Sequence, residues 1–146
     1  MSVQPIPAGY HSVTPYIVVH DAKAAIEFYI NAFGASEVLR LNSPDGKIAH
    51  AEVKIGDSHV MLADEHPDFG ALSPKTVGGS PVSMLIYCED VDAMFQRAIS
   101  AGATEKRPVQ DQFYGDRSGV VEDHFGHSWS IATHIEDLTQ EEAEPR

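Results

Sequence analysis

The side chains best suited to take part in chemistry lie on one predicted strand, residues 48–55. His50 and Glu52 are two residues apart, so an extended backbone directs both side chains to the same face. A carboxylate beside an imidazole can bind a small molecule, exchange a proton or contribute to a divalent-metal site. The same spacing is also typical of a solvated polar face, and that interpretation stays open.

A second group of chemically capable residues, Tyr114–Arg117, falls in a predicted loop over residues 111–118. The guanidinium of Arg117 suits a carboxylate or phosphonate ligand, because its fork of donors matches two acceptor oxygens. Asp116 can hold that fork in place or consume it in an internal ion pair, and Tyr114 can donate a hydrogen bond or stack. Alternatively, the Asp–Arg pair only braces the loop or a dimer contact. Glu52 and Tyr114 are the candidate catalytic residues, with no reaction assigned to them.

Composition limits the class of protein. The chain has 146 residues, of which 42% are hydrophobic and 22% charged, as in one globular domain. Its formal net charge of −12 disfavours nucleic acid and anionic membranes as partners. The one cysteine, Cys88, can form neither an intrachain disulfide nor a Cys-based zinc site. The N-terminus lacks a signal-peptide pattern and no apolar run could span a membrane, so we expect a cytoplasmic protein.

The two halves of the chain repeat one order of predicted elements, a strand, a helix and three further strands. In the first half, the helix follows an N-cap at Asp21 and ends at Gly34. In the second half, the helix follows an N-cap at Asp90 and stops at Gly102. The alternation of apolar and polar residues predicts strands over residues 13–19, 36–41, 48–55, 58–63, 81–88, 103–107, 119–122 and 127–134. Trp129 alternates with Ser128 and Ser130, so we expect its indole in the core.

This order predicts an α+β fold of two β-α-β-β-β modules that form an open, cup-shaped mixed sheet with both helices on its outer face. The concave face is the natural place for a small-molecule site. Within one domain overall, we expect an extended lead-in, a first module, a linker that is also a candidate lid, a second module and an acidic tail. These parts span residues 1–12, 13–64, 65–79, 80–135 and 136–146.

Three stretches of the chain resemble a known superfamily. Val13–Gly34 (VTPYIVVHD…IEFY…AFG) is similar to the opening of vicinal-oxygen-chelate proteins, which include glyoxalase I, bleomycin- and fosfomycin-resistance proteins and extradiol dioxygenases. Asp111–Gly119 (DQFYGDRSG) and Asp123–His134 (DHFGHSWSIATH) resemble the PhnB-like branch. The resemblance covers residues 10–137 and implies paired modules in a homodimer. In catalytic members, it implies one divalent metal held in the cup by His and Glu side chains.

The resemblance also implies where four metal ligands would lie. These positions carry Thr14, Glu52, Ser83 (or Met84) and Ser130, and only Glu52 is a good ligand for a divalent metal. We therefore expect neither the standard metal site nor a cofactor, but binding of a small molecule, with an anion as one option. The expected ligand-binding residues are Thr14, His50, Glu52, Ser83, Tyr114, Asp116, Arg117 and Ser130.

Two other functions remain open. The first alternative is a metal-dependent lyase or isomerase of the glyoxalase type, with one divalent ion in a rearranged site around His50 and Glu52 and with His59 as a further candidate. The second is a protein-interaction module without a small-molecule site. The chain contains no P-loop, nucleophile elbow or dinucleotide fingerprint that would indicate another enzyme class.

Overall fold

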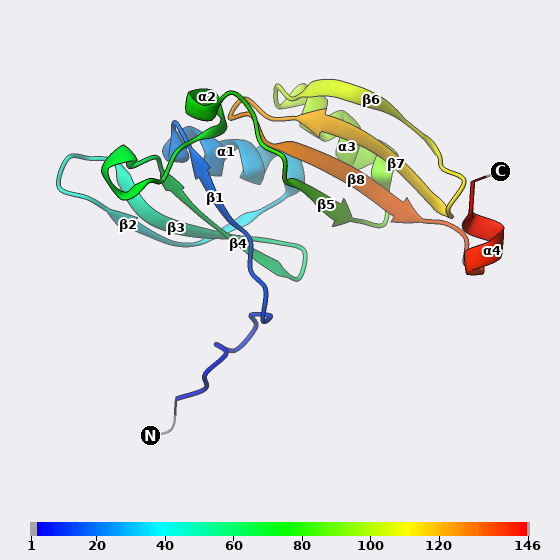
Figure 1. Ribbon diagram of the computed structural model, residues 1–146, viewed down its shortest axis with the longest axis horizontal. Coiled ribbons are helices and arrows are strands. Elements are labelled where there is room, and N and C mark those ends of the chain that lie inside the picture. Colours follow the sequence, from blue (N-terminus) through cyan, green and yellow to red (C-terminus); the bar gives the residue numbers. More distant parts are fainter. Residues whose placement is uncertain (1–2, 146) are drawn as a thin grey trace. The chain divides into compact units, whose positions relative to one another are not determined.

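Each half of the chain forms one four-stranded mixed sheet with one long helix (Figure 1). The computed structural model describes residues 3–145. The chain divides into two compact units, one ending at Gly78 and the other starting at Gly79, here called the first and second modules. Both sheets are open, and the predicted α+β fold with two β-α-β-β-β modules is confirmed; each module forms a four-stranded sheet of its own.

The first module contains the predicted helix and four strands in the predicted order. These are β1 (Tyr16–Val19), α1 (Ala22–Phe33), β2 (Ser36–Asn42), β3 (Ile48–Ile55) and β4 (Ser58–Asp64). The strands are ordered β1-β4-β3-β2, with β1 parallel to β4 and the other pairs antiparallel. The side chain of Asp21 caps α1 by accepting from Ala24 N at 3.1 Å, and Gly34 ends it in the left-handed conformation (φ 68°). Both predicted helix ends are confirmed.

The core of the first module follows the strand alternation. Val19, Val53 and Leu62 are fully buried on the face of the sheet that carries the core. Asp64 joins helix and sheet, because its Oδ1 accepts from Ala22 N at 2.8 Å and its Oδ2 from Ile48 N at 2.7 Å. The opposite face of β3 carries His50 and Glu52 together with Ile48 and Lys54.

The second module repeats this plan. Its elements are β5 (Ser83–Tyr87), α3 (Val91–Ser100), β6 (Thr104–Asp111), β7 (Asp116–Glu122) and β8 (Ser128–His134), with strand order β5-β8-β7-β6. Asp90 caps α3 as predicted, accepting from Ala93 N at 3.1 Å. Thr133 Oγ1 accepts from Val91 N at 2.9 Å and so takes the part that Asp64 has in the first module. Trp129 is 1% exposed, which confirms its predicted place in the core.

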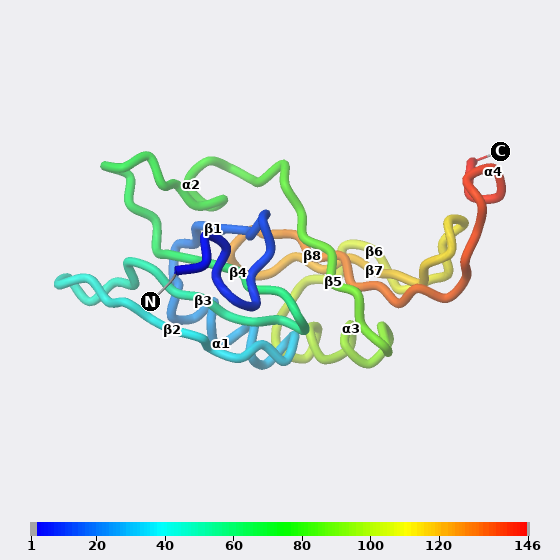
Figure 2. The backbone as a smooth tube through the Cα atoms, turned by 90° about the horizontal axis from the view of Figure 1, so that it is seen from below, coloured from blue at the N-terminus to red at the C-terminus, as the bar shows by residue number. Residues whose placement is uncertain are grey.

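Three predicted irregular segments contain more regular structure than expected. The loop expected over residues 111–118 shrinks to residues 112–115, because Gln112 N donates to Asp116 O at 2.7 Å and closes a β6–β7 hairpin. The segment between β4 and β5, visible as the long green loop in Figure 2, contains η1 (Pro67–Phe69) and α2 (Pro74–Val77). The acidic tail contains α4 (Gln140–Ala143), which a capping box between Thr139 and Glu142 stabilises. Polar segments of this kind carry no apolar periodicity that would predict their structure.

The structure contains no candidate membrane span within residues 3–145, since none of the helices there has both the length and the apolar character required.

Candidate functional site

Five polar and aromatic side chains gather on the face of the first sheet opposite its core. β3 supplies His50 and Glu52, β1 supplies Tyr16, β4 supplies His59, and the segment before β1 supplies Tyr10. We call these five residues the Tyr–His–Glu cluster. The predicted pairing of His50 and Glu52 on one face is confirmed, since His50 Nε2 and Glu52 Oε2 are 2.8 Å apart.

Glu52 is the centre of this cluster and is only 7% exposed. The Tyr10 hydroxyl donates to Glu52 Oε1, and His50 Nε2 bonds to Oε2. His50 Nδ1 lies 2.9 Å from the Tyr16 hydroxyl. This pattern assigns the neutral imidazole a proton on Nε2, donated to the carboxylate, while Nδ1 accepts from Tyr16. Each oxygen of the Glu52 carboxylate therefore has a donor from the protein itself.

The electrostatics of the cluster favour an ionised Glu52. Burial acts to raise the pKa of Glu52, but the hydrogen bonds from Tyr10 and His50 outweigh it and hold that pKa below its usual value. The hydrogen bond to Glu52 raises the pKa of Tyr10, and burial followed by the charge of Glu52 raises the pKa of Tyr16. A carboxylate with a lowered pKa is a weak general base near neutral pH, so this site is better suited to binding than to proton abstraction.

Tyr10 and His59 join the cluster through their rings, which stack with centroids 3.9 Å apart and planes inclined by 18°. Within residues 3–145, no group hydrogen-bonds the buried Nδ1 of His59. The sequence does not indicate Tyr10, because it lies in an irregular lead-in where no periodicity gives a direction. His59 is a further candidate from the sequence, and the ring stack places it on this face.

A cavity of about 250 Å³ shares Tyr16 with the Tyr–His–Glu cluster. Its walls come from β1, the β2–β3 hairpin, β3, the end of β4 and the segment that follows β4. Its lining includes the apolar or aromatic side chains of Tyr16, Val18, Ile48 and Ala63. An apolar hollow beside a few converging polar groups is the usual form of a small-molecule site.

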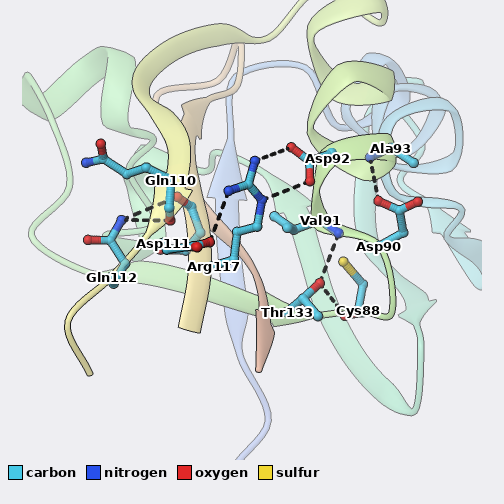
Figure 3. Close-up of polar contacts among 11 residues, drawn as sticks. Cys88, Asp90, Val91, Asp92, Ala93, Gln110, Asp111, Gln112, Arg117 and Thr133 are labelled. Carbon is cyan, nitrogen blue, oxygen red and sulfur yellow. Dashed lines mark hydrogen bonds and ion pairs between the residues drawn. The ribbon is translucent and has the colours of Figure 1, made fainter. Parts of the chain in front are cut away.

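The guanidinium of Arg117 forms ion pairs with other residues of the second module (Figure 3). Its Nε and Nη2 donate to the two oxygens of Asp92 at 2.9 and 3.0 Å, and its Nη1 donates to Asp111 Oδ1 at 3.0 Å. Of the alternatives that the sequence leaves open, the internal ion pair forms with Asp92 and Asp111 and not with Asp116, because Asp116 and Arg117 are successive residues of β7 and successive strand side chains point to opposite faces. Arg117 thus braces α3 against the β6–β7 hairpin, and its role toward a ligand remains a prediction.

Asp116 belongs to a different hydrogen-bond network from Arg117. The Tyr87 hydroxyl donates to its Oδ2 at 2.7 Å, and His134 Nδ1 lies 2.8 Å from its Oδ1. His134 Nε2 in turn lies 2.7 Å from Asp137 Oδ1 in the tail. Tyr114 contacts the ring of Phe113 edge-on and is 45% exposed, in the turn between β6 and β7. The predicted group of Tyr114, Asp116 and Arg117 is therefore divided among three different surroundings.

Comparison with known proteins assigns the family. The sequence-family model of the Glyoxalase/Bleomycin resistance protein/Dioxygenase superfamily matches residues 9–131 of this chain. The chain belongs to this superfamily. The protein Mb0911c of Mycobacterium bovis is 43% identical to this superfamily member over 134 residues, which cover 90% of this chain and 88% of that protein.

Solved structures share the fold of this chain. TioX from Micromonospora sp. ML1 is 26% identical, with a TM-score of 0.67 over 88% of this chain and 100% of that one. The PhnB protein from Bacillus cereus is 18% identical, with a TM-score of 0.64 over 84% and 99% of the two chains, and shows the fold alone. The resemblance is confirmed for the superfamily, while the PhnB-like branch stays a prediction.

The superfamily resemblance implies four positions for metal ligands. In this chain one of them is Glu52, and the other three carry hydroxyl side chains, Thr14, Ser83 and Ser130. Thr14 precedes β1, and its hydroxyl donates to the carbonyl of His11 at 3.3 Å. Ser83 is the exposed first residue of β5, and Ser130 lies half-buried on β8. Among residues 3–145, no three His, Cys, Asp or Glu side chains are placed to hold a metal ion. This donor set does not fit a catalytic divalent ion, which needs three protein ligands.

Proposed function

We propose that this superfamily member binds a small molecule on the face of the first sheet opposite its core, without using a protein-bound metal. The observation that carries the proposal is the buried carboxylate of Glu52, which converges with His50 and two tyrosines beside an apolar cavity. On binding, Tyr10 would exchange its hydrogen bond to Glu52, and Tyr16 its hydrogen bond to His50, for bonds to the ligand. The apolar walls would supply the affinity, and the polar cluster would fix the orientation.

Several neighbouring properties belong to the same proposal. The stretches Asp111–Gly119 and Asp123–His134 favour a place in the PhnB-like branch. The net charge of −12 favours a protein without nucleic-acid or membrane partners, which we place in the cytoplasm. Thr14, Ser83, Tyr114 and Ser130 remain proposed ligand contacts. The guanidinium of Arg117 suggests an anionic ligand by its type, but it already binds two carboxylates.

A metal-dependent lyase or isomerase is the second candidate, favoured by the convergence of His50 and Glu52 at 2.8 Å. Both nitrogens of His50 are already engaged in hydrogen bonds, and each oxygen of Glu52 has a donor. A metal would have to displace these bonds and still find a third ligand. Binding without a metal is therefore the stronger proposal.

A fragment screen by amide NMR of the full chain tests the proposed function. We expect fragments to shift the amide signals of β1, β3 and the end of β4, with the same shifts after EDTA treatment. Replacing Glu52→Gln should weaken the best fragment about tenfold, because a buried charged acceptor is lost. Glu122→Gln, on β7, is the matched control and should leave the affinity unchanged. Shifts confined to the second module, or binding that disappears with EDTA, would reject the proposal.

A further inference from the structure

The cavity beside the Tyr–His–Glu cluster has features that select a class of ligand. We propose that it binds a planar aromatic cation, an inference that rests on the proposed small-molecule function of the same face. Its volume and apolar walls, its aromatic rim and its charge are independent observations.

The interior of the cavity suits a flat apolar body. β1 contributes Tyr16 and Val18, and two small or branched residues, Ile48 and Ala63, contribute from β3 and β4. Ile48 is 3% exposed and Ala63 7%, so these walls are fixed by the packing of the module. A volume of about 250 Å³ accommodates a molecule of a few fused rings and excludes a large substrate.

An exposed aromatic ring lies at the rim of this cavity. Phe69 lines the cavity although its side chain is 84% exposed. Its ring stacks on His66 with centroids 4.4 Å apart and planes inclined by 26°. The segment that carries both rings is closed by the backbone bridge between His66 and Ala71. A supported Phe ring that faces water offers a stacking surface, and covering it with a planar ligand removes apolar area from solvent.

Acidic side chains dominate the charge at the cavity. Asp45, Asp64 and Glu65 line it, against the single ammonium of Lys47. Neutral groups donate hydrogen bonds to all three carboxylates: Ser43 and Lys47 N to Asp45, the backbone of Ala22 and Ile48 to Asp64, and Ser73 and Thr76 to Glu65.

These donors fix the three carboxylates in place without cancelling their charge. A hydroxyl and a backbone donor hold the pKa of Glu65 below its usual value, and the same holds for the pKa of Asp45. The field of the cavity therefore attracts a cation and repels an anion. A cation that stacks on Phe69 or Tyr16 gains a cation–π contribution as well.

Two tricyclic probes of similar shape and opposite charge test the inference with the full chain. The cation is 9-aminoacridine and the anion is 9-anthracenecarboxylate, each titrated by its own fluorescence. We expect the cation to bind about tenfold more tightly than the anion. Phe69→Ala should weaken the cation about tenfold, and Glu65→Gln, which retains an acceptor oxygen, should weaken it about threefold. Phe113→Ala removes an exposed ring of the second module and should have no effect.

Each result supports or rejects the inference. Equal or tighter binding of the anion, or unchanged cation affinity in Phe69→Ala, would overturn it. The proposed function would survive that outcome if the fragment shifts still fall on β1, β3 and β4 and still depend on Glu52. If neither probe binds and no fragment shifts those strands, the inference and the proposed function are both wrong.

Discussion

At the scale of single residues, the buried carboxylates of this chain are distinguished by their partners. Glu52 has a phenol and an imidazole, Asp116 has the same two kinds of group, and Asp123 accepts from two backbone N–H groups and an indole N–H. Each satisfies the requirement that a buried polar group finds a hydrogen bond. Asp123 fixes a turn, whereas the phenols and imidazoles around Glu52 and Asp116 are groups that can rearrange.

Asp123 is expected to be the most sensitive acidic residue for stability. Its Oδ1 accepts from the backbone of Phe125 and His127 at 2.9 Å each, and its Oδ2 accepts from Trp129 Nε1 at 2.8 Å. Asp123→Ala leaves three donors without this acceptor and should lower the free energy of unfolding by about 3 kcal/mol or more, and Asp123→Asn by less. Urea unfolding followed by the fluorescence of the single tryptophan measures this. Asp57→Ala, in an exposed hairpin turn, is the control, and an equal loss in both alanine variants would contradict the prediction.

His134 should make stability depend on pH. Its hydrogen bonds to Asp116 and then to Asp137 raise its pKa above 6.5, and Tyr87 is the other titratable group that contacts Asp116. Because the folded pKa is raised, the stabilisation is complete below the unfolded pKa and is lost as pH rises through the folded pKa. The melting temperature of wild type should therefore exceed that of His134→Gln by more at about pH 6 than at about pH 9. His11→Gln, an exposed histidine, should show no such trend, and a difference that grows with pH would contradict the assignment.

At the scale of elements, the contact of α3 with β7 depends on a residue without a side chain. A Cβ on Gly119 would lie 2.8 Å from Phe95 Cε2 and 2.9 Å from Val109 Cγ2. Both distances are shorter than van der Waals contact, so helix and strand could not keep their present separation.

Gly119→Ala is therefore expected to destabilise the second module. Overpacking of this kind costs about 1–3 kcal/mol, measurable as a lower urea midpoint. Adding Val109→Ala or Phe95→Leu should recover part of the loss, since either change makes room for the new methyl group. Strictly additive losses in the double variants would show that the methyl group does not meet these side chains.

At the scale of the whole molecule, we propose a homodimer. Large apolar side chains are exposed on the edge strand β5, with Leu85 52% and Tyr87 62% exposed. Exposed apolar groups on sheet edges are typical of surfaces that become covered by a partner.

Light scattering measures the oligomeric state directly. We expect a mass of about twice the 15.9 kDa of one chain. Leu85→Glu should favour the monomer, because it places a charge on the edge of β5. Val77→Glu, on α2 and 58% exposed, is the control and should leave the mass unchanged. A mass of one chain for wild type at every concentration would reject the homodimer.

The sequence by itself determined the features that depend on neighbouring residues. The caps at Asp21, Gly34 and Asp90 fix the helix ends through contacts within a few positions, and the alternation over β3 fixes the shared face of His50 and Glu52. Such features depend on local backbone geometry, which the order of residue types reports directly.

Only the tertiary structure decided which distant groups meet. Tyr10 donates a hydrogen bond to Glu52, which lies 42 positions further along the chain. Arg117 pairs with Asp92, 25 positions away, and not with the adjacent Asp116. The register of strand pairing and the packing of each helix bring these residues together, and no periodicity along the chain encodes such contacts. The polar cluster on the first sheet and the cavity beside it exist because segments far apart in the sequence fold onto one face.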